Sequence, residues 1–410
     1  MKVLLVNNFY YNRGGDCTYM FALKKLFEEN GHKVIVFSMH HPLNFPSEYS
    51  KYFVSYINYD EEVRKISLAS GIRVLSRTIF SWEAGRRIEE LIDEERPDIA
   101  HINNIHHHIT PSIFYPLKRH KIPIVWTLHD YTIICPNTSF LAHGRICERC
   151  RKTRYFWAPL IRCKKDSFLA SLVAGIESTI HRLTRVNDLV DVFITPSEFL
   201  REKLIEYGFK EDRIICMYHF SEPISDQGDV LPNGYILYVG RLSHEKGIRT
   251  LIDAVSGQDV TLKIIGDGPL REEMVNYVKL KGTDRIEFLG HMSHDEVLRY
   301  MKGCRFVVMP SEWYENYPFA VIEAFARGKP VIGSDTGGLP ELIRDTERGL
   351  LFEMGSPADL SATINYLLKN PDLVTEIGEN ARRFVMEVLN GRSYYERLIA
   401  LYEALLSKKP

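Results

Sequence analysis

Residues 311–333 read SEWYENYPFAVIEAFARGKPVIG, and this stretch decides the fold. The apolar run Phe306 to Met309 comes just before it and predicts a strand that leads into a loop carrying Glu315. We expect a helix to open at Pro318, because proline needs no amide donor in a first helical turn, and to stop at Gly328. The pattern therefore predicts a strand–loop–helix unit of the kind that builds α/β proteins.

The same stretch predicts a nucleotide-sugar site. Backbone N–H groups at a helix start, here at Phe319 and Ala320, suit a phosphate. Glu323 follows Pro318 by five residues, about 7.5 Å along a helix axis, which is roughly the distance from a diphosphate to the ribose hydroxyls. Glu315 lies on the other side of the phosphate, where it could contact whatever the diphosphate carries.

A second motif supplies positive charge. Gly240-Arg241 and Lys246-Gly247 follow the predicted strand Tyr235–Val239 and precede a helix. Arginine can bind two phosphate oxygens at once, and lysine adds a point charge, so the pair suits a diphosphate. A solvated basic turn is the alternative for this motif alone. No pair of aspartates stands at a strand end, so we expect these cations and the helix dipole to bind the phosphates without a metal.

Composition places the chain among ordinary globular proteins. The 410 residues are 45% hydrophobic and 26% charged, which predicts two or three domains. A net charge of −1 argues against nucleic-acid binding. No apolar run approaches the ~20 residues of a membrane span, and the apolar core of Met1–Asn7 is too short for a signal peptide. We therefore expect a cytoplasmic protein, with peripheral contact at the inner face of a membrane as an alternative.

Short β-branched runs alternate with helical patterns from end to end, which predicts two Rossmann-like parallel-sheet domains facing a central cleft. We expect an amino-terminal domain over 1–220, a linker at Ser221–Gly234, a second domain over 234–389, and a final helix over 390–410. The predicted strands are Lys2–Asn7, Lys33–Ser38, Ile99–Ile102, Ile124–Leu128, Asp191–Thr195, Arg213–Met217, Tyr235–Val239, Thr261–Ile265, Arg285–Phe288, Phe306–Met309, Val331–Gly333 and Gly349–Phe352.

The spacing C-x11-C-x2-C-x12-C joins four cysteines: Cys135, Cys147, Cys150 and Cys163. Four thiolates at this spacing could hold a structural zinc. The alternative is that these cysteines are simply reduced and buried. They lie in a basic segment, Lys118 to Arg185, with thirteen Lys or Arg against four acids. Aromatic residues interrupt these charges. Basic and aromatic residues together suit an anionic membrane surface or a phosphate-bearing acceptor.

Five strings in one order resemble the retaining glycosyltransferases of the GT-B fold, family 4. They are the Gly14-Gly15 loop after the first strand, Thr127-Leu128-His129-Asp130, Gly240 to Gly247, the E-x7-E segment from Glu315 to Glu323, and Gly337-Gly338-Leu339-Pro340-Glu341. The resemblance extends over most of the chain, and it implies that the final helix, 390–410, crosses back to the first domain. One departure is Ala320, which stands where many members of the family have glycine and makes the pocket slightly tighter.

Each motif has an expected role: Gly337-Gly338-Leu339-Pro340-Glu341 forms a tight turn that lines the cleft, and the resemblance implies the roles of the others. Arg241 and Lys246 neutralise the leaving diphosphate, and Glu315 contacts hydroxyls of the donor sugar. The Gly14-Gly15 loop faces the diphosphate and the acceptor. His129 lies beside the donor sugar, with a capping role as the alternative. Asp130 orients the His129 ring or contacts the acceptor.

Three adjacent histidines, His106 to His108, look like metal ligands, but neighbours cannot all point one way, and we expect His106 to border the acceptor pocket.

We therefore expect a metal-independent retaining glycosyltransferase with no catalytic cofactor. A sugar would move from a nucleoside-diphosphate-sugar, with UDP favoured over GDP, to a glycan or lipid-linked hydroxyl acceptor in polysaccharide, lipopolysaccharide or glycolipid synthesis. The alternatives are a nucleotide-sugar epimerase on the same scaffold, which would need further acid and base residues, and a non-catalytic nucleotide-sugar-binding protein.

Overall fold

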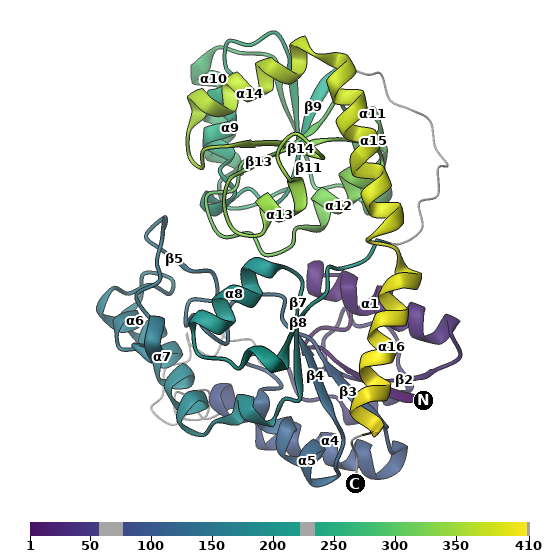
Figure 1. Cartoon of the computed structure of the whole chain (residues 1–410). Helices are drawn as coiled ribbons and strands as arrows, with labels where there is room; N and C mark the ends of the chain where they lie inside the picture. Colours follow the sequence, from purple (N-terminus) through teal and green to yellow (C-terminus); the bar gives the residue numbers. More distant parts are fainter. Residues whose placement is uncertain (57–76, 222–233, 408–410) are drawn as a thin grey trace. The chain divides into compact units, whose positions relative to one another are not determined.

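The computed structural model describes residues 1–56, 77–221 and 234–407 (Figure 1). These residues fall into two compact units. The first comprises the described residues of Met1–His143, Cys147–Met217 and Tyr394–Pro410, and the second those of Gly144–Ile146 and Tyr218–Ser393. The linker that the sequence predicts at Ser221–Gly234 lies outside the described residues except at its two ends.

The first unit is built on a six-stranded, all-parallel sheet of order β2-β1-β3-β4-β7-β8. Its strands are β1 (Lys2–Val6), β2 (Lys33–Phe37), β3 (Ile99–Ile102), β4 (Ile124–Thr127), β7 (Val192–Thr195) and β8 (Ile214–Cys216). Its helices are α1 (Gly15–Glu29), α4 (Trp82–Glu95), α5 (Phe114–Arg119), α6 (Trp157–Leu160), α7 (Phe168–Leu183), α8 (Glu198–Glu206) and α16 (Gly391–Ser407). Two short strands, β5 (Leu141–Ala142) and β6 (Arg145–Ile146), lie in the segment between β4 and α6.

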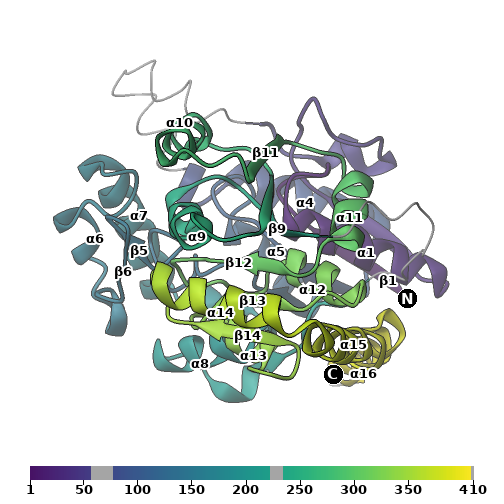
Figure 2. The same cartoon turned by 90° about the horizontal axis from the view of Figure 1, so that it is seen from above.

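The second unit repeats the plan with the order β11-β10-β9-β12-β13-β14, again all parallel. Its strands are β9 (Tyr235–Val239), β10 (Thr261–Ile265), β11 (Ile286–Gly290), β12 (Val307–Met309), β13 (Val331–Ser334) and β14 (Gly349–Phe352). Its helices are α9 (Ile248–Val255), α10 (Arg271–Lys281), α11 (His294–Gly303), α12 (Phe319–Ala326), α13 (Leu339–Ile343), α14 (Pro357–Lys369) and α15 (Pro371–Glu387), and Figure 2 shows α15 alongside the sheet from above.

All twelve predicted strands are present, each within two residues of its expected bounds. They form because runs such as Val3 to Val6 are apolar on both faces and are buried completely, as strands of a sheet covered on both sides must be. The prediction of two Rossmann-like parallel-sheet domains is confirmed.

The strand orders place a switch point in each sheet. In the second sheet, β10 and β11 lie on one side of β9, whereas β13 and β14 lie on the far side of β12, so the strand order reverses between β9 and β12. In the first sheet, the strand order reverses in the same way between β1 and β3. Loops that follow the two strands of a switch point diverge and leave room for a ligand beyond the carboxyl ends of the strands. The loops after β9 and β12, and those after β1 and β3, are therefore the expected positions of ligand-binding residues.

The chain ends in the first unit. The Tyr394 hydroxyl on α16 forms a hydrogen bond with the Tyr19 hydroxyl on α1. The Tyr402 hydroxyl, also on α16, forms a hydrogen bond with His101 Nδ1 of β3. All four side chains are buried, so α16 covers the first sheet as an integral part of that unit. No helix in the described ranges is both long enough and apolar enough to cross a bilayer.

Candidate active site

The loops after β9 and β12 meet through an ion pair. Lys246 Nζ lies 2.6 Å from Glu315 Oε1, and the Ser311 hydroxyl donates a hydrogen bond of 2.6 Å to the same oxygen. Lys246 Nζ also lies 4.9 Å above the centre of the Trp313 ring. Lys246 and Glu315 are 69 positions apart in the chain, and they meet because β9 and β12 are neighbours at the switch point of the second sheet.

Glu315 is charged although it is buried. Only 4% of the residue is exposed, and burial by itself would raise the pKa of its carboxyl group. The positive charge of Lys246 and the hydrogen bonds from Lys246 and Ser311 outweigh burial, so the pKa is lowered instead. The carboxylate is therefore ionised at neutral pH and forms a charged pair with the lysine.

Glycines allow these loops to approach each other. Gly247 has φ +63°, and a Cβ there would lie 1.8 Å from the Pro310 carbonyl oxygen. Gly337, with φ +62°, would bring a Cβ within 2.5 Å of the Glu315 carbonyl oxygen, and the Gly338 amide donates to that oxygen at 2.6 Å. The Gly337-Gly338 turn thus supports the backbone of Glu315.

Helix α12 begins one residue later than predicted. Pro318 is its N-cap, with φ −74° and ψ 118°, and no side chain caps the helix. Phe319, the first helical residue, stacks on His219 with ring centres 5.4 Å apart. Gly328 follows the helix with φ +66°, the left-handed conformation expected at a helix end.

Glu323 has a neighbour that the sequence did not reveal. Its Oε1 lies 3.8 Å from His294 Nδ1, at the start of α11. Burial raises the pKa of Glu323, while His294 and Arg327 act to lower it. The side chain of Glu323 is only partly buried, with 22% of it exposed.

Arg241 lies exposed at the carboxyl end of β9, where its backbone carbonyl accepts a hydrogen bond of 2.8 Å from the Tyr238 hydroxyl. The guanidinium group is therefore available to an anion while its backbone is fixed by the sheet.

In the first unit, the loops after β1 and β3 are joined by asparagines. The Asn104 amide donates to Asn7 Oδ1 at 3.0 Å, and Asn8 Nδ2 donates to the His106 carbonyl at 2.8 Å. Gly14 and Gly15 lie at the start of α1, with Gly14 as its N-cap. Gly14 has φ −172°, extended backbone that any residue adopts, and a Cβ there would make only an ordinary contact with Asp16, so the fold itself does not require glycine at this position.

His129 follows β4 by two residues and forms a hydrogen bond with Asn103. Its Nε2 lies 3.1 Å from Asn103 Oδ1, and its ring packs on Tyr19 with centres 5.1 Å apart. Burial lowers the pKa of His129, against the opposing charges of Asp16 and Asp130, so the imidazole is neutral at pH 7. Asp130 accepts a hydrogen bond of 2.8 Å from the Thr132 amide, and its role beside His129 stays a prediction.

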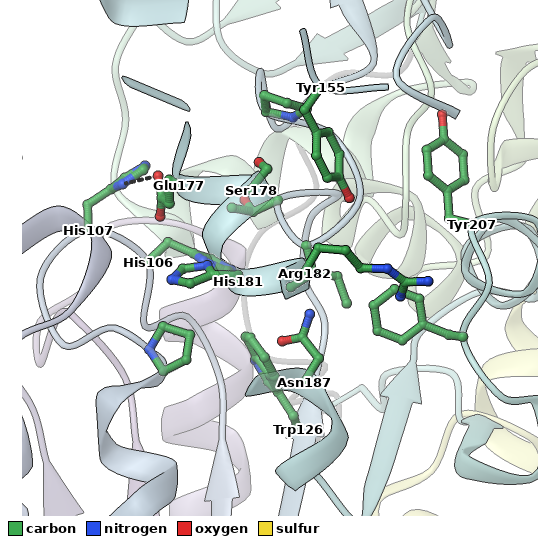
Figure 3. Close-up of a pocket in the computed structure, with 15 residues that line it drawn as sticks. His106, His107, Trp126, Tyr155, Glu177, Ser178, His181, Arg182, Asn187 and Tyr207 are labelled. Carbon is green, nitrogen blue, oxygen red and sulfur yellow. Dashed lines mark ion pairs between the residues drawn. The ribbon is translucent and has the colours of Figure 1, made fainter. Parts of the chain in front are cut away.

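His106 and His107 line a cavity in the first unit, shown in Figure 3. His108 does not line it; its ring stacks against Tyr56, with centres 6.0 Å apart. The expected divergence of the three histidines is thus visible. Helix α7 supplies much of the cavity's polar wall through Glu177, Ser178, His181 and Arg182. The other lining residues are Pro111, Trp126, Thr132, Ile133, Pro136, Tyr155, Asn187, Tyr207 and Phe209.

Burial favours the neutral forms of both Glu177 and His107 in this wall. Burial raises the pKa of Glu177 to about 7 and lowers the pKa of His107 well below its usual value. Glu177 Oε2 and His107 Nδ1 are 3.5 Å apart. Hydroxyl groups, which both donate and accept hydrogen bonds, match such a wall of neutral polar side chains.

Replacing Glu177 by glutamine is expected to stabilise the protein at alkaline pH. The folded-state pKa of about 7 lies above the ordinary 4.5, so the stability that Glu177 contributes is fully present below pH 4.5 and is lost as the pH rises through 7. That loss amounts to about 3 kcal/mol. Denaturant unfolding of wild type and E177Q at several pH values measures it, with E202Q, an exposed glutamate of α8, as the control. A difference that does not change with pH would show that Glu177 ionises normally.

The four cysteines of the expected zinc site are reduced; Cys135 and Cys150 are buried, and Cys147 and Cys163 are partly exposed. Across the described ranges, no group of three or more His, Cys, Asp or Glu side chains is arranged to hold a metal ion. Burial raises the pKa values of Cys135, Cys150 and Cys163, which favours their thiols. Zinc at these cysteines stays a prediction.

Comparison with known proteins identifies the family of both halves. Residues 13–220 match the model for Glycosyltransferase Family 4, and residues 225–384 match the model for Glycosyl transferases group 1. An uncharacterized glycosyltransferase of Methanocaldococcus jannaschii is 35% identical over 51% of this chain, a match that spans only 60% of that protein's length. The N-acetyl-alpha-D-glucosaminyl L-malate synthase of Bacillus anthracis is 22% identical over 99% of this chain and 97% of its own.

Among solved structures, Anabaena HepE in complex with UDP-glucose has a TM-score of 0.67 at 16% identity, covering 98% of this chain and 100% of that one. This likeness supports the GT-B fold. Since the first family model covers half of the chain and the second most of the remainder, the chain belongs to glycosyltransferase family 4.

Proposed function

We propose that this chain transfers a sugar from a nucleoside-diphosphate-sugar to a hydroxyl acceptor. The observation that carries the proposal is the Lys246–Glu315 ion pair at the switch point of the second sheet. It places a cation and a buried carboxylate together where open α/β sheets bind ligands, and the amino terminus of α12 follows in the same loop. If the ion pair only held the two loops together, the exposed Arg241 at the end of β9 would have no part in it. A diphosphate site gives Arg241 a role beside Lys246.

The donor's parts are assigned to residues of the second unit. Arg241 and Lys246 neutralise the diphosphate as it leaves, and the amides at Phe319 and Ala320 bind its oxygens. Glu323 accepts hydrogen bonds from the ribose hydroxyls, and Glu315 from hydroxyls of the sugar. Fixed cations and a helix terminus stabilise the charge that develops on the leaving group, so the proposed reaction needs no divalent ion.

The acceptor's parts are assigned to the first unit. The Gly14-Gly15 loop serves the diphosphate and the acceptor, and His106 and Asp130 lie on the acceptor side. His129, neutral because it is buried, would stabilise positive charge at the anomeric carbon through its ring and the nearby backbone carbonyl. The polar cavity behind His106 suits a hydroxyl-rich part of the acceptor.

UDP is the proposed nucleotide, and retention is the proposed stereochemistry. The likeness to a protein solved with UDP-glucose favours UDP, and the resemblance to retaining enzymes favours a same-face substitution guided by the leaving phosphate. A glycan or lipid-linked acceptor in polysaccharide, lipopolysaccharide or glycolipid synthesis fits this reaction.

Proton NMR of donor hydrolysis tests the mechanism without knowledge of the acceptor. A panel of α-linked UDP-sugars and GDP-sugars is incubated with the protein in EDTA, and the first spectra are recorded before mutarotation. We expect the sugar to be released as the α-anomer, from a UDP donor, with no added metal. Initial release of the β-anomer, or turnover only after a divalent ion is added, would overturn the proposed mechanism.

A further inference from the structure

Helix α7 turns its aliphatic side to solvent. Leu169, Ile176 and Leu183 are 70%, 36% and 76% exposed and are spaced seven residues apart, so they share one face of the helix. Leu172, Val173 and Ile180 fall on the same face by the helical repeat and are half-buried. The result is a continuous aliphatic stripe along a sixteen-residue helix.

The opposite side of α7 is small and polar, and it is the side that is buried. Ser171, Ala174, Gly175 and Glu177 are buried, and Glu177 belongs to the wall of the cavity behind His106. An amphipathic helix of a soluble domain normally buries its apolar side. Here the polar side lines a cavity instead, which leaves the aliphatic stripe without cover from the described residues.

Helix α6 continues the apolar surface. It packs against α7, and Figures 1 and 2 both show the two side by side at one edge of the first unit. Phe156, Leu160 and Phe168 are each at least half exposed. An apolar hollow between α6 and α7 is lined in part by Phe156, Pro159 and Ile176. We define the α6–α7 face as Phe156, Leu160, Phe168, Leu169, Ile176 and Leu183.

Positive charge surrounds this face. Residues 149–166 hold seven Lys or Arg and a single acid, Asp166. Six of those basic residues are exposed: Arg149, Arg151, Lys152, Arg154, Arg162 and Lys165. Aliphatic and aromatic side chains surrounded by basic ones are the composition that binds the interface of an anionic bilayer.

We propose that the α6–α7 face docks on the surface of an anionic lipid bilayer. The aliphatic stripe enters the interface between headgroups and acyl chains, and the basic residues of 149–165 meet lipid phosphates. The cavity then lies on the other side of the docked helix, next to the membrane surface. This inference concerns binding alone and holds whether or not the chain transfers a sugar.

Vesicle co-sedimentation of the full chain tests the proposal. Wild type should bind vesicles that contain phosphatidylglycerol, bind those of phosphatidylcholine alone much more weakly, and lose affinity with added salt, because exposed charges are screened beyond about 8 Å at physiological ionic strength. L169Q/I176Q/L183Q should weaken vesicle binding at least tenfold. Each aliphatic side chain that enters the bilayer interface contributes roughly a factor of ten to affinity, and glutamine loses that contribution. R151Q/K152Q/R154Q should weaken binding to anionic vesicles by about tenfold or more.

L280Q is the matched control, because Leu280 is 86% exposed on α10 in the second unit, and it should bind vesicles as wild type does. Thermal unfolding of every variant should match wild type, since the altered side chains are exposed. Failure of wild type to bind anionic vesicles at low salt would refute the proposal. So would equal binding by wild type and the aliphatic variant. A wild-type dimer that L169Q/I176Q/L183Q converts to a monomer, without vesicle binding, would assign the face to a second copy of the chain.

Discussion

Replacing Lys246 by methionine is expected to lower kcat by a factor of about 10²–10³, as removal of one preorganised charge-stabilising group does in other active sites. The lysine would neutralise the leaving diphosphate, so its loss acts on the transition state more than on binding of the nucleoside. Initial rates of donor hydrolysis, measured by release of nucleoside diphosphate, give the effect. Because K246R keeps the charge, it should retain more activity than K246M.

The same substitution should destabilise the second unit, because it leaves Glu315 ionised, buried and without its cation. Breaking a buried pair from one side costs about 3–5 kcal/mol. Changing both partners, K246M/E315Q, removes the uncompensated charge and should restore most of the stability while activity stays low. Thermal unfolding of the single and double variants separates the two effects. Full activity in K246M/E315Q would show that the pair only holds the loops together.

Replacing Glu323 by alanine should weaken nucleotide binding by about ten- to a hundredfold, because a hydrogen bond from a ribose hydroxyl to a charged acceptor is worth roughly 1.5–3 kcal/mol. Calorimetric titration with UDP measures this affinity. E376A, which changes an exposed glutamate of α15, is the matched control and should bind as wild type does. Equal affinity in wild type and E323A would remove Glu323 from the site.

A pH series adds a second test of Glu323. Burial raises the pKa of its carboxyl group, so the charged form that binds the ribose is lost at a higher pH than for an exposed glutamate. Wild-type affinity should therefore fall on acidification more steeply than that of E323Q, which cannot ionise. Parallel pH profiles would contradict a ribose-binding carboxylate at this position.

The sequence predicted the strands well because each is a short apolar run buried on both faces, and a parallel sheet imposes that pattern at every strand. It also placed Glu315, Lys246 and Arg241 at strand ends. The Lys246–Glu315 contact could not be derived from spacing, since it depends on the strand order that sets β12 beside β9. A chain gives its strands in sequence, but their order in the sheet is a tertiary property.

Other features depended on tertiary packing that no local pattern reports. His294 lies near Glu323 because α11 packs against α12, and a histidine at the start of a helix gives no sign of this. His129 forms a hydrogen bond with Asn103, because β3 lies next to β4 in the sheet. Helix α7 has an ordinary amphipathic pattern, from which one would expect its aliphatic side to face the core. In the structure the polar side of α7 lines the cavity, and the aliphatic side therefore faces solvent.

Titration of nucleotides and nucleotide-sugars into the wild-type protein in EDTA, followed by calorimetry, tests the central claim most directly. The account predicts saturable, one-to-one binding of UDP and of a UDP-sugar that is weakened in both K246M and E323A and unchanged in E376A. It would be contradicted if no nucleoside diphosphate or nucleotide-sugar bound the folded wild-type protein, or if binding were the same in K246M and E323A as in wild type.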